Sequence, residues 1–407
     1  MKTPILTALL AGTLTAAAAP DYTLHEWGTF TTLSTSEGAL LPGVQREEEP
    51  LPEFVETHAG MLHPDWMRAV KGWFRPLAGV TVRMETPVIY FYTKQAFDVH
   101  VDVGFKGGSI SQWYPDRSGG ETPPPIKVNG QGWPLDKENT LDFSKGYNGG
   151  IQWDVKVEPA GEDAAGRVFK PGETPSWIYP RNPDSAIVTT KDGQSEKYLF
   201  YRGLGQLSLP VTFSSKVSGS VTIKNTGSQA TGTLLVYERS DDGSARWATV
   251  EALAGGTTTT VDLVSKPGTQ NWKAGVYADG IAMLTKAGLY RKEADAMMQT
   301  WWPSYFNRAG LRVFWVVPRA FTDTVLPLTA SPAPKETVRV LVGRSEVMTP
   351  QFESRLVSDF AAAEKEGRNR WDSDRYFPAF IERVRQINAR TASAGTQPEP
   401  VTAKASR

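Results

Sequence analysis

The sequence predicts an α+β protein that is predominantly antiparallel β and sandwich-like, with a C-terminal mixed segment of about four helices. Short runs of β-branched and aromatic residues, separated by turn residues, fill most of the chain up to residue 264. Apolar residues at helical spacing dominate only after residue 273. The chain has 407 residues and no cysteine, so an apolar core must hold the fold without disulfides or thiolate-bound metal.

The first 18 residues have the pattern of a secretory signal peptide. Lys2 gives a positive start, residues 5–14 carry no charge, and small residues lead up to Ala18. The apolar run is shorter than the ~20 residues that span a bilayer. We therefore expect cleavage after Ala18 and an exported mature protein, periplasmic or extracellular, without a membrane span.

An N-terminal β-rich region is predicted over residues 19–205. Residues 22–33 (YTLHEWGTFTTL) are rich in Thr and aromatic residues, and residues 88–92 (VIYFY) are continuously apolar, as in a strand buried on both faces. Residues 99–105 alternate apolar and polar side chains, which is typical of a half-buried strand. Further strands are expected over residues 151–157 and 197–203.

Residues 206–270 are predicted to form a sandwich-like unit of short strands, with a tight hairpin turn at Asp242-Gly243. Residues 271–390 are predicted to form an α/β segment, and residues 391–407 lack periodicity and are expected to be disordered. Within the α/β segment, helices are expected over residues 274–286 and 291–302, from residue 350 and over residues 377–387, with strands over residues 311–317 and 338–342.

The charge balance argues against nucleic acid or anionic membranes as partners, because 44 basic residues match 44 acidic ones and no basic stripe stands out. Thirteen Trp residues are many for this length. Most are expected to fill the core, but Trp133 and Trp177 lie in Pro/Gly-rich segments where an exposed indole could stack on carbohydrate. Arg202, between aromatic residues, is a third candidate binding residue; the alternative is a paired structural role.

A divalent metal would have to draw on the few histidines and on carboxylates. The candidate ligands are His25, His58 and His63 with Glu26 or the acidic run at residues 47–49. Adjacent residues of a strand point to opposite faces, so His25 and Glu26 are not expected to share one metal. The alternative is that the histidines are structural and that the acidic run is a solvated loop.

For a carbohydrate-active enzyme, the acids to consider are Glu26 and Glu85, since glycoside hydrolysis needs two carboxyl groups across a cleft. Glu85 shares a strand face with Arg83, which is equally typical of a structural ion pair. The sequence has no G-x-S-x-G elbow, no HExxH pair and no Gly-rich phosphate loop.

Several longer strings are distinctive: HEWGTFT (25–31), EEEPLP (47–52), METPVIYFY (84–92), QWYP (112–115), FYRGLG (200–205) and LRVFWVVPR (311–319). With these strings the chain resembles, over nearly its whole mature length, a family of exported bacterial proteins of unassigned function. The resemblance implies an exported bacterial protein and assigns no role to any residue.

The sequence thus favours a β-rich binding or assembly module of a bacterial envelope, with carbohydrate or an envelope protein as partner. Two alternatives remain open, namely a metal-assisted hydrolase that uses the N-terminal His and Glu residues, and a carbohydrate-active protein. The hydrolase requires that His25, Glu26, His58 and His63 converge on one point, at the ligand distance of about 2 Å.

Overall fold

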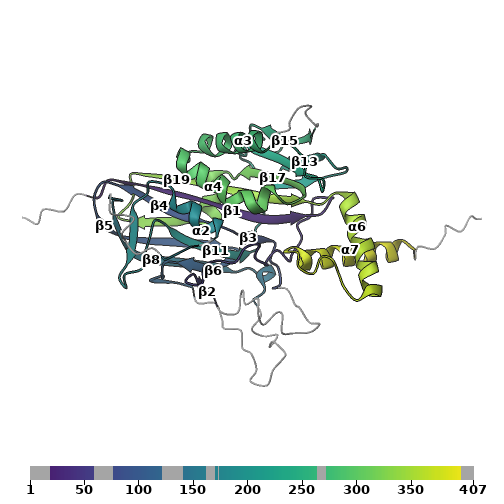
Figure 1. Ribbon diagram of the computed structural model, residues 1–407, viewed down its shortest axis with the longest axis horizontal. Helices are drawn as coiled ribbons and strands as arrows, with labels where there is room; N and C mark the ends of the chain where they lie inside the picture. Colours follow the sequence, from purple (N-terminus) through teal and green to yellow (C-terminus); the bar gives the residue numbers. More distant parts are fainter. Residues whose placement is uncertain are drawn as a thin grey trace, which may run out of the picture.

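The computed structural model describes residues 19–58, 77–121, 141–161, 170–172, 174–263 and 272–395. Its largest sheet has ten strands (Figure 1). In spatial order these are β15 (Ala245–Val250), β14 (Leu234–Arg239), β17 (Gly310–Val316), β19 (Glu336–Val347), β1 (Tyr22–Ser34), β3 (Val82–Met84), β11 (Leu199–Gly205), β6 (Gly108–Tyr114) and β2 (Glu56–Thr57), with β4 (Val88–Thr93) beside β1 and β11.

Two smaller sheets complete the β structure. The six-stranded sheet contains β10 (Ser195–Glu196), β9 (Ile187–Thr190), β8 (Asn148–Glu158), β5 (Phe97–Lys106) and β18 (Leu328–Ser331), with β7 (Gly119–Gly120) beside β8. The three-stranded sheet contains β12 (Val211–Ser214), β13 (Ser220–Asn225) and β16 (Thr258–Asp262). The strands between residues 206 and 270 are therefore divided between this small sheet and the large one.

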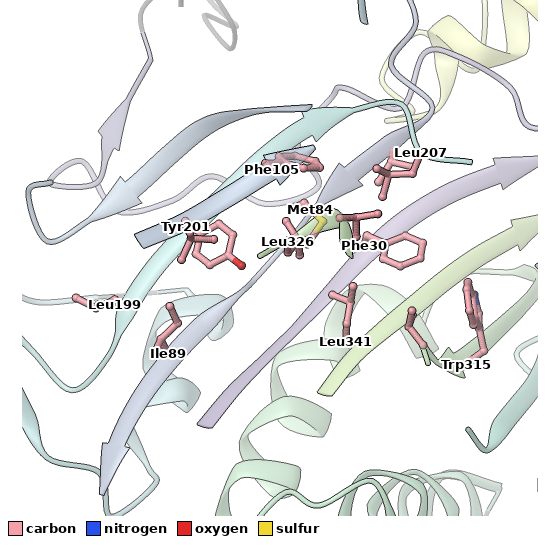
Figure 2. Packing of buried hydrophobic residues seen from close by; sticks show 14 of the residues in the cluster. Phe30, Met84, Ile89, Phe105, Leu199, Tyr201, Leu207, Trp315, Leu326 and Leu341 are labelled. Atoms are coloured by element: carbon pink, nitrogen blue, oxygen red, sulfur yellow. The ribbon is translucent and has the colours of Figure 1, made fainter. Parts of the chain in front are cut away.

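Strand β1 organises the large sheet. It runs parallel to β19 along its length and antiparallel to β3 and β4. Because side chains alternate along a strand, Phe30 faces the core shared by the sheets while Trp27 faces the helices. Figure 2 shows Phe30, Met84 and Leu341 within the first of these cores.

Helices cover the opposite face of the large sheet. Helices α3 (Trp272–Lys286) and α4 (Arg291–Trp301) bury side chains such as Met297 against Trp27 and Phe314, in a core distinct from that between the sheets. The short helices α2 (Pro175–Ile178) and α5 (Arg319–Val325) were not expected from the sequence. The predicted α+β class, with a β-rich sandwich-like core and mostly C-terminal helices, is confirmed.

Two further helices lie together beyond the strand ends (Figure 1, yellow). Helix α6 (Pro350–Glu366) starts at Thr349, whose hydroxyl accepts a hydrogen bond from the Phe352 amide at 3.2 Å, and it ends at the left-handed Gly367. Helix α7 (Phe377–Gly395) continues five residues past residue 390, where a disordered tail was expected to begin. Both helices share a third apolar core with Leu33 at the end of β1 and Met348 just after β19.

None of the helices in the described ranges is long and apolar enough to cross a membrane.

Candidate functional site

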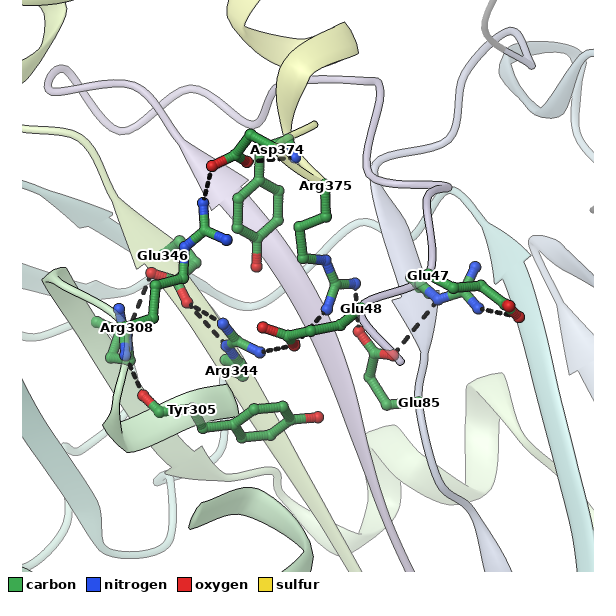
Figure 3. A network of polar contacts seen from close by, with 12 residues as sticks. Glu47, Glu48, Glu85, Tyr305, Arg308, Arg344, Glu346, Asp374 and Arg375 are labelled. Carbon is green, nitrogen blue, oxygen red and sulfur yellow. Dashed lines mark hydrogen bonds and ion pairs between the residues drawn. The ribbon is translucent and has the colours of Figure 1, made fainter. Parts of the chain in front are cut away.

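A cluster of charged side chains is buried where the C-terminal helices meet the large sheet (Figure 3). The strand residues among them lie on the face of the large sheet against which α3 and α4 pack. We call this cluster the ion network, and its members are Arg83, Arg202, Arg308, Arg312, Arg344, Arg375, Glu47, Glu48, Glu85, Glu346 and Asp374.

Arg375 bridges two buried carboxylates at the centre of the ion network. Its Nη1 donates to Glu48 at 2.6 Å and its Nη2 donates to Glu85 at 2.6 Å. Arg344 Nη1 donates to Glu48 from the other side at 2.7 Å, and Arg83 Nε donates to Glu85 at 3.4 Å. Arg83 and Glu85 therefore form an ion pair, which is the structural alternative that their shared strand face indicated.

The ion network continues towards the start of β17. Glu346 accepts hydrogen bonds from Arg344 Nε at 2.7 Å and from Arg312 Nε at 3.2 Å. The guanidinium carbon of Arg344 lies 4.0 Å from the centre of the Tyr305 ring, a cation–π contact. Arg308 reaches across to Asp374, which lies just before α7, and so joins the sheet to the helical pair.

The pairing fixes the charge of the buried acids. Burial by itself raises the pKa of the Glu85 carboxyl, but the guanidiniums of Arg375, Arg83 and Arg202 outweigh it and lower the pKa to about 2. The pKa of Glu346 is likewise lowered, because Arg312 and Arg344 outweigh the effect of burial. These carboxylates therefore stay ionised near neutral pH.

An open cleft of about 770 Å³ adjoins the ion network. It lies at the ends of β14, β17 and β19, and α6 and the segment before α7 form its other wall. Its apolar lining comes from both sides and consists of Leu33, Leu311, Val347, Met348, Phe352, Trp371, Tyr376 and Phe380.

A smaller hollow of about 350 Å³ continues the cleft, because both are lined by Arg308, Arg370, Trp371 and Asp374. Glu47, Glu48, Ser373 and Arg375 complete the lining of the smaller hollow. The edge of the ion network is thus accessible from the cleft.

Tyr376 lies between the cleft and the ion network. The guanidinium carbons of Arg308 and Arg375 are 5.0 Å and 5.1 Å from the centre of its ring. Burial raises the pKa of Tyr376 to about 12, so its hydroxyl stays protonated near neutral pH. Together with Trp371 it gives the cleft an aromatic wall next to charged groups.

His25 and Glu26 point to opposite faces of β1, as the strand alternation predicts. His25 Nδ1 lies 2.9 Å from Glu293, a buried acid on α4. Glu26 accepts hydrogen bonds from Tyr201 at 2.7 Å and from Arg339 at 2.6 Å in the layer between the sheets. Each side chain has a buried structural partner on its own face of the sheet.

The structure does not bring the predicted metal ligands together. His58 follows β2 at the edge of the sheet, four strands from His25 on β1. Glu48 binds Arg344 on β19. Arg344 lies opposite Thr31 of β1 in the strand register, and Thr31 is six residues, or about 20 Å, along β1 from His25. His63 lies outside the described residues. Within those residues, no group of three or more His, Asp or Glu side chains is arranged to hold a metal.

The two candidate catalytic acids are also separated. Glu85 donates its backbone amide to the carbonyl of Thr29, and Thr29 faces the helices because its hydroxyl accepts a hydrogen bond from Trp301. Cross-strand neighbours share a face, so Glu85 also faces the helices, whereas Glu26 faces the layer between the sheets. A sheet therefore separates these acids, and they cannot flank one glycosidic bond.

Two of the candidate binding residues, Trp177 and Arg202, are buried, and for Trp177 this corrects the exposure considered from the sequence. Trp177 is fully buried on α2, where its indole donates to Glu196 at 3.2 Å and packs on Phe200. It therefore cannot stack on an external sugar. Arg202 is also buried, and its Nε donates to the backbone carbonyl of Glu85 as part of the ion network. Trp133 lies outside the described residues.

The sequence reasoning missed the segment between the two C-terminal helices. Residues 368–376 (RNRWDSDRY) combine three arginines and two aromatic residues with two aspartates at close spacing, which was the available signal. The sequence reasoning also favoured a solvated loop for residues 47–49. In the structure, two buried arginines, Arg344 and Arg375, bind Glu48. These partners are remote in sequence.

Comparison with known proteins leaves the chain without an assigned family. No family model and no curated protein matches it. Among solved structures it is similar to the yeast delta-COP-I mu-homology domain complexed with the Dsl1 WxWxV peptide, with a TM-score of 0.27 and 7% identity, covering 81% of this chain and 98% of that chain. The same domain without the peptide gives a TM-score of 0.28 at 7% identity and the same coverage. A β-glucuronidase from glycoside hydrolase family 2 gives a TM-score of 0.13 at 11% identity, covering 64% of this chain and 24% of that one. No argument about function rests on similarities of this size.

Proposed function

We propose that this protein is a β-rich binding module whose ligand binds in the cleft between the strand ends of the large sheet and helices α6 and α7. The observation that supports it is the cleft itself, with an apolar and aromatic lining beside a rigid set of buried charges. Its volume of about 770 Å³ falls within the range typical of ligand sites, roughly 300–1,000 Å³.

Charge states at the cleft favour binding over acid–base catalysis. A general acid or base works best when its pKa lies near the working pH. The pKa of Glu346, which lines the cleft, is lowered away from neutrality, and the pKa of Tyr376 is raised to about 12. No histidine is among the described residues that line the cleft.

We further propose that the protein works in the bacterial envelope after export. The support is the signal-peptide pattern of residues 1–18. Expression of the full-length chain in a Gram-negative host, followed by N-terminal sequencing of the periplasmic fraction, tests this proposal. A mature chain beginning at Ala19 is the expected result, whereas an unprocessed cytoplasmic chain would contradict it.

The binding proposal can be tested by filling the cleft with a large side chain introduced at its rim. Gln351 is exposed at the start of α6 and lines the cleft, whereas Ser358, about two turns further along the same helix, is exposed and is not among the lining residues. Gln351→Trp should place a large ring in the cleft, and Ser358→Trp is the matched control.

The probes are a displayed library of random peptides and an immobilised glycan array, so that both predicted partner classes are sampled. We expect ligands selected with the wild type to lose at least about tenfold in affinity for Gln351→Trp and to bind Ser358→Trp unchanged. Carbohydrate is the second candidate, because the half-buried Trp371 lines the cleft. Ligands that bind both variants equally would contradict a site in the cleft.

A further inference from the structure

The charges around the cleft indicate what kind of ligand it accepts. Building on the proposed function, we infer that the ligand is an acidic peptide segment of a partner protein that carries one large apolar side chain. The inference rests on two properties of the lining, an apolar floor and a rim whose accessible charge is positive.

The floor suits an apolar anchor. Leu311, Val347 and Met348 reach the cleft from the ends of β17 and β19, and Phe380 reaches it from α7. All four are buried within the protein's own apolar cores or beside them. A Leu or Phe side chain of a ligand would extend this apolar surface, and buried anchors of this kind supply much of the affinity of peptide interfaces.

The acids of the lining are largely inaccessible. Four basic and four acidic residues line the cleft, but the side chains of Glu238, Glu346 and Asp374 are only 8%, 8% and 13% exposed. Each of them already binds an arginine. Among the acids of the lining, only Asp241 is well exposed, at 75%.

The cations of the lining are more accessible and more weakly paired. Arg370 is 62% exposed and lies 3.7 Å from Asp359, and Arg355 is 41% exposed and lies 3.2 Å from Asp241. Arg239 donates to the backbone carbonyl of Asn307 at 2.6 Å and forms no ion pair within the described residues. Exposed ion pairs contribute little stability, so carboxylates of a ligand can compete for these guanidiniums.

An acidic peptide therefore matches the cleft in both chemistry and layout. Its carboxylates would meet Arg239, Arg355 and Arg370 at the rim, where bidentate guanidinium–carboxylate bonds can form. Its apolar side chain would reach the floor beyond them. A basic peptide would meet the same three guanidiniums with only Asp241 to offset them, because Glu238, Glu346 and Asp374 are largely buried and already bind arginines.

The test uses fluorescence polarisation with three labelled peptides of about 12 residues. The first has Glu and Asp around a central Phe, the second is its Lys and Arg counterpart, and the third is the acidic peptide with Ala in place of the Phe anchor. The proteins are the wild type, Arg355→Glu/Arg370→Glu and Arg368→Glu. Arg368 is exposed two residues before Arg370 and does not line the cleft, so it controls for charge reversal outside the cleft.

We expect the acidic anchored peptide to bind at least about tenfold more tightly than either other peptide, and more weakly as salt is added. The double variant should lose that preference while Arg368→Glu keeps it. Equal or tighter binding of the basic peptide would overturn the inference. If these peptides do not bind but library or glycan ligands do, and Gln351→Trp abolishes that binding, the proposed function stands and the inference fails. If no ligand at all is sensitive to Gln351→Trp, both fail.

Discussion

Arg375 donates a hydrogen bond to Glu48 at 2.6 Å across a separation of 327 positions in the chain. Its other terminal nitrogen donates to Glu85 at 2.6 Å. The segment before α7 is thereby tied to the N-terminal loop and to the end of β3. Because Arg375 and Glu85 are buried and Glu48 is only 18% exposed, the geometry of the cleft wall depends on these ion pairs.

Replacing Arg375 by Ala should strongly destabilise the protein. Glu48 and Glu85 would each lose a buried cationic partner, and breaking a buried ion pair costs about 3–5 kcal/mol. The free energy of unfolding, measured by urea denaturation, tests this. The matched control is Arg385→Ala, whose guanidinium is 72% exposed and should contribute about 1 kcal/mol or less. Similar losses in the two variants would refute a structural role for the ion network.

Acid should weaken the protein through Glu85. Burial raises the pKa of this carboxyl, but Arg375 and its neighbours outweigh burial and lower the pKa to about 2, from 4.5 in the ordinary case. A depressed pKa in the folded state stabilises it above pH 4.5, and that contribution disappears as the pH falls towards 2.

The Glu85→Gln variant isolates this effect. Unfolding free energies at pH values of about 7, 5 and 3 should fall steeply for the wild type below pH 5 and less steeply for the variant. The variant should also be the less stable protein at neutral pH. Identical slopes for the two proteins would show that Glu85 does not contribute to the acid sensitivity.

Trp177 should matter for stability and not for ligand binding. Its indole is fully buried against Phe200 and Tyr114, so Trp177→Ala leaves a large cavity and should cost about 3–5 kcal/mol. Ile178→Ala, at the neighbouring position with 42% exposure, should change stability by about 1 kcal/mol or less. If a fully folded Trp177→Phe variant lost glycan binding, this result would contradict the prediction and indicate that Trp177 stacks on a sugar.

His25 should stabilise the fold through Glu293 rather than through a metal. The pair is buried with an Nδ1–carboxylate distance of 2.9 Å, so His25→Ala should cost about 1.5–3 kcal/mol. His100→Ala is the control, because that ring is 43% exposed and pairs with Asp154 on the surface. Unfolding is measured with and without EDTA. A chelator effect that is present in the wild type and absent in His25→Ala would instead identify His25 as a metal ligand.

The strands were predicted well because the apolar runs and alternation that indicate them involve residues close together in the chain. Residues 88–92 and 99–105 were recognised by apolar runs and by alternation, and both lie within observed strands. The opposite directions of His25 and Glu26 followed from the same alternation. The parallel pairing of β1 with β19 joins residues more than 300 positions apart, and nothing local indicates it.

The candidate site could not be predicted for the same reason. Glu48 sits in a run of three glutamates that is typical of a solvated loop, and only the fold brings Arg344 and Arg375 to it. Trp177 lies beside prolines, and its burial depends on side chains from β6 and β11. Charge pairs and aromatic contacts between distant segments are tertiary properties.

A single-site fluorescent label can show whether the ligand binds in the cleft, and the absence of cysteine makes such labelling simple. An acrylodan label is attached to Gln351→Cys at the cleft rim or to Ser358→Cys on the same helix outside it, and each protein is titrated with a ligand selected on the wild type. A ligand bound in the cleft should give a saturable spectral shift at position 351, with the same dissociation constant as unlabelled protein in competition, and no shift at position 358. Binding that leaves the label at position 351 unchanged would contradict a ligand site in the cleft.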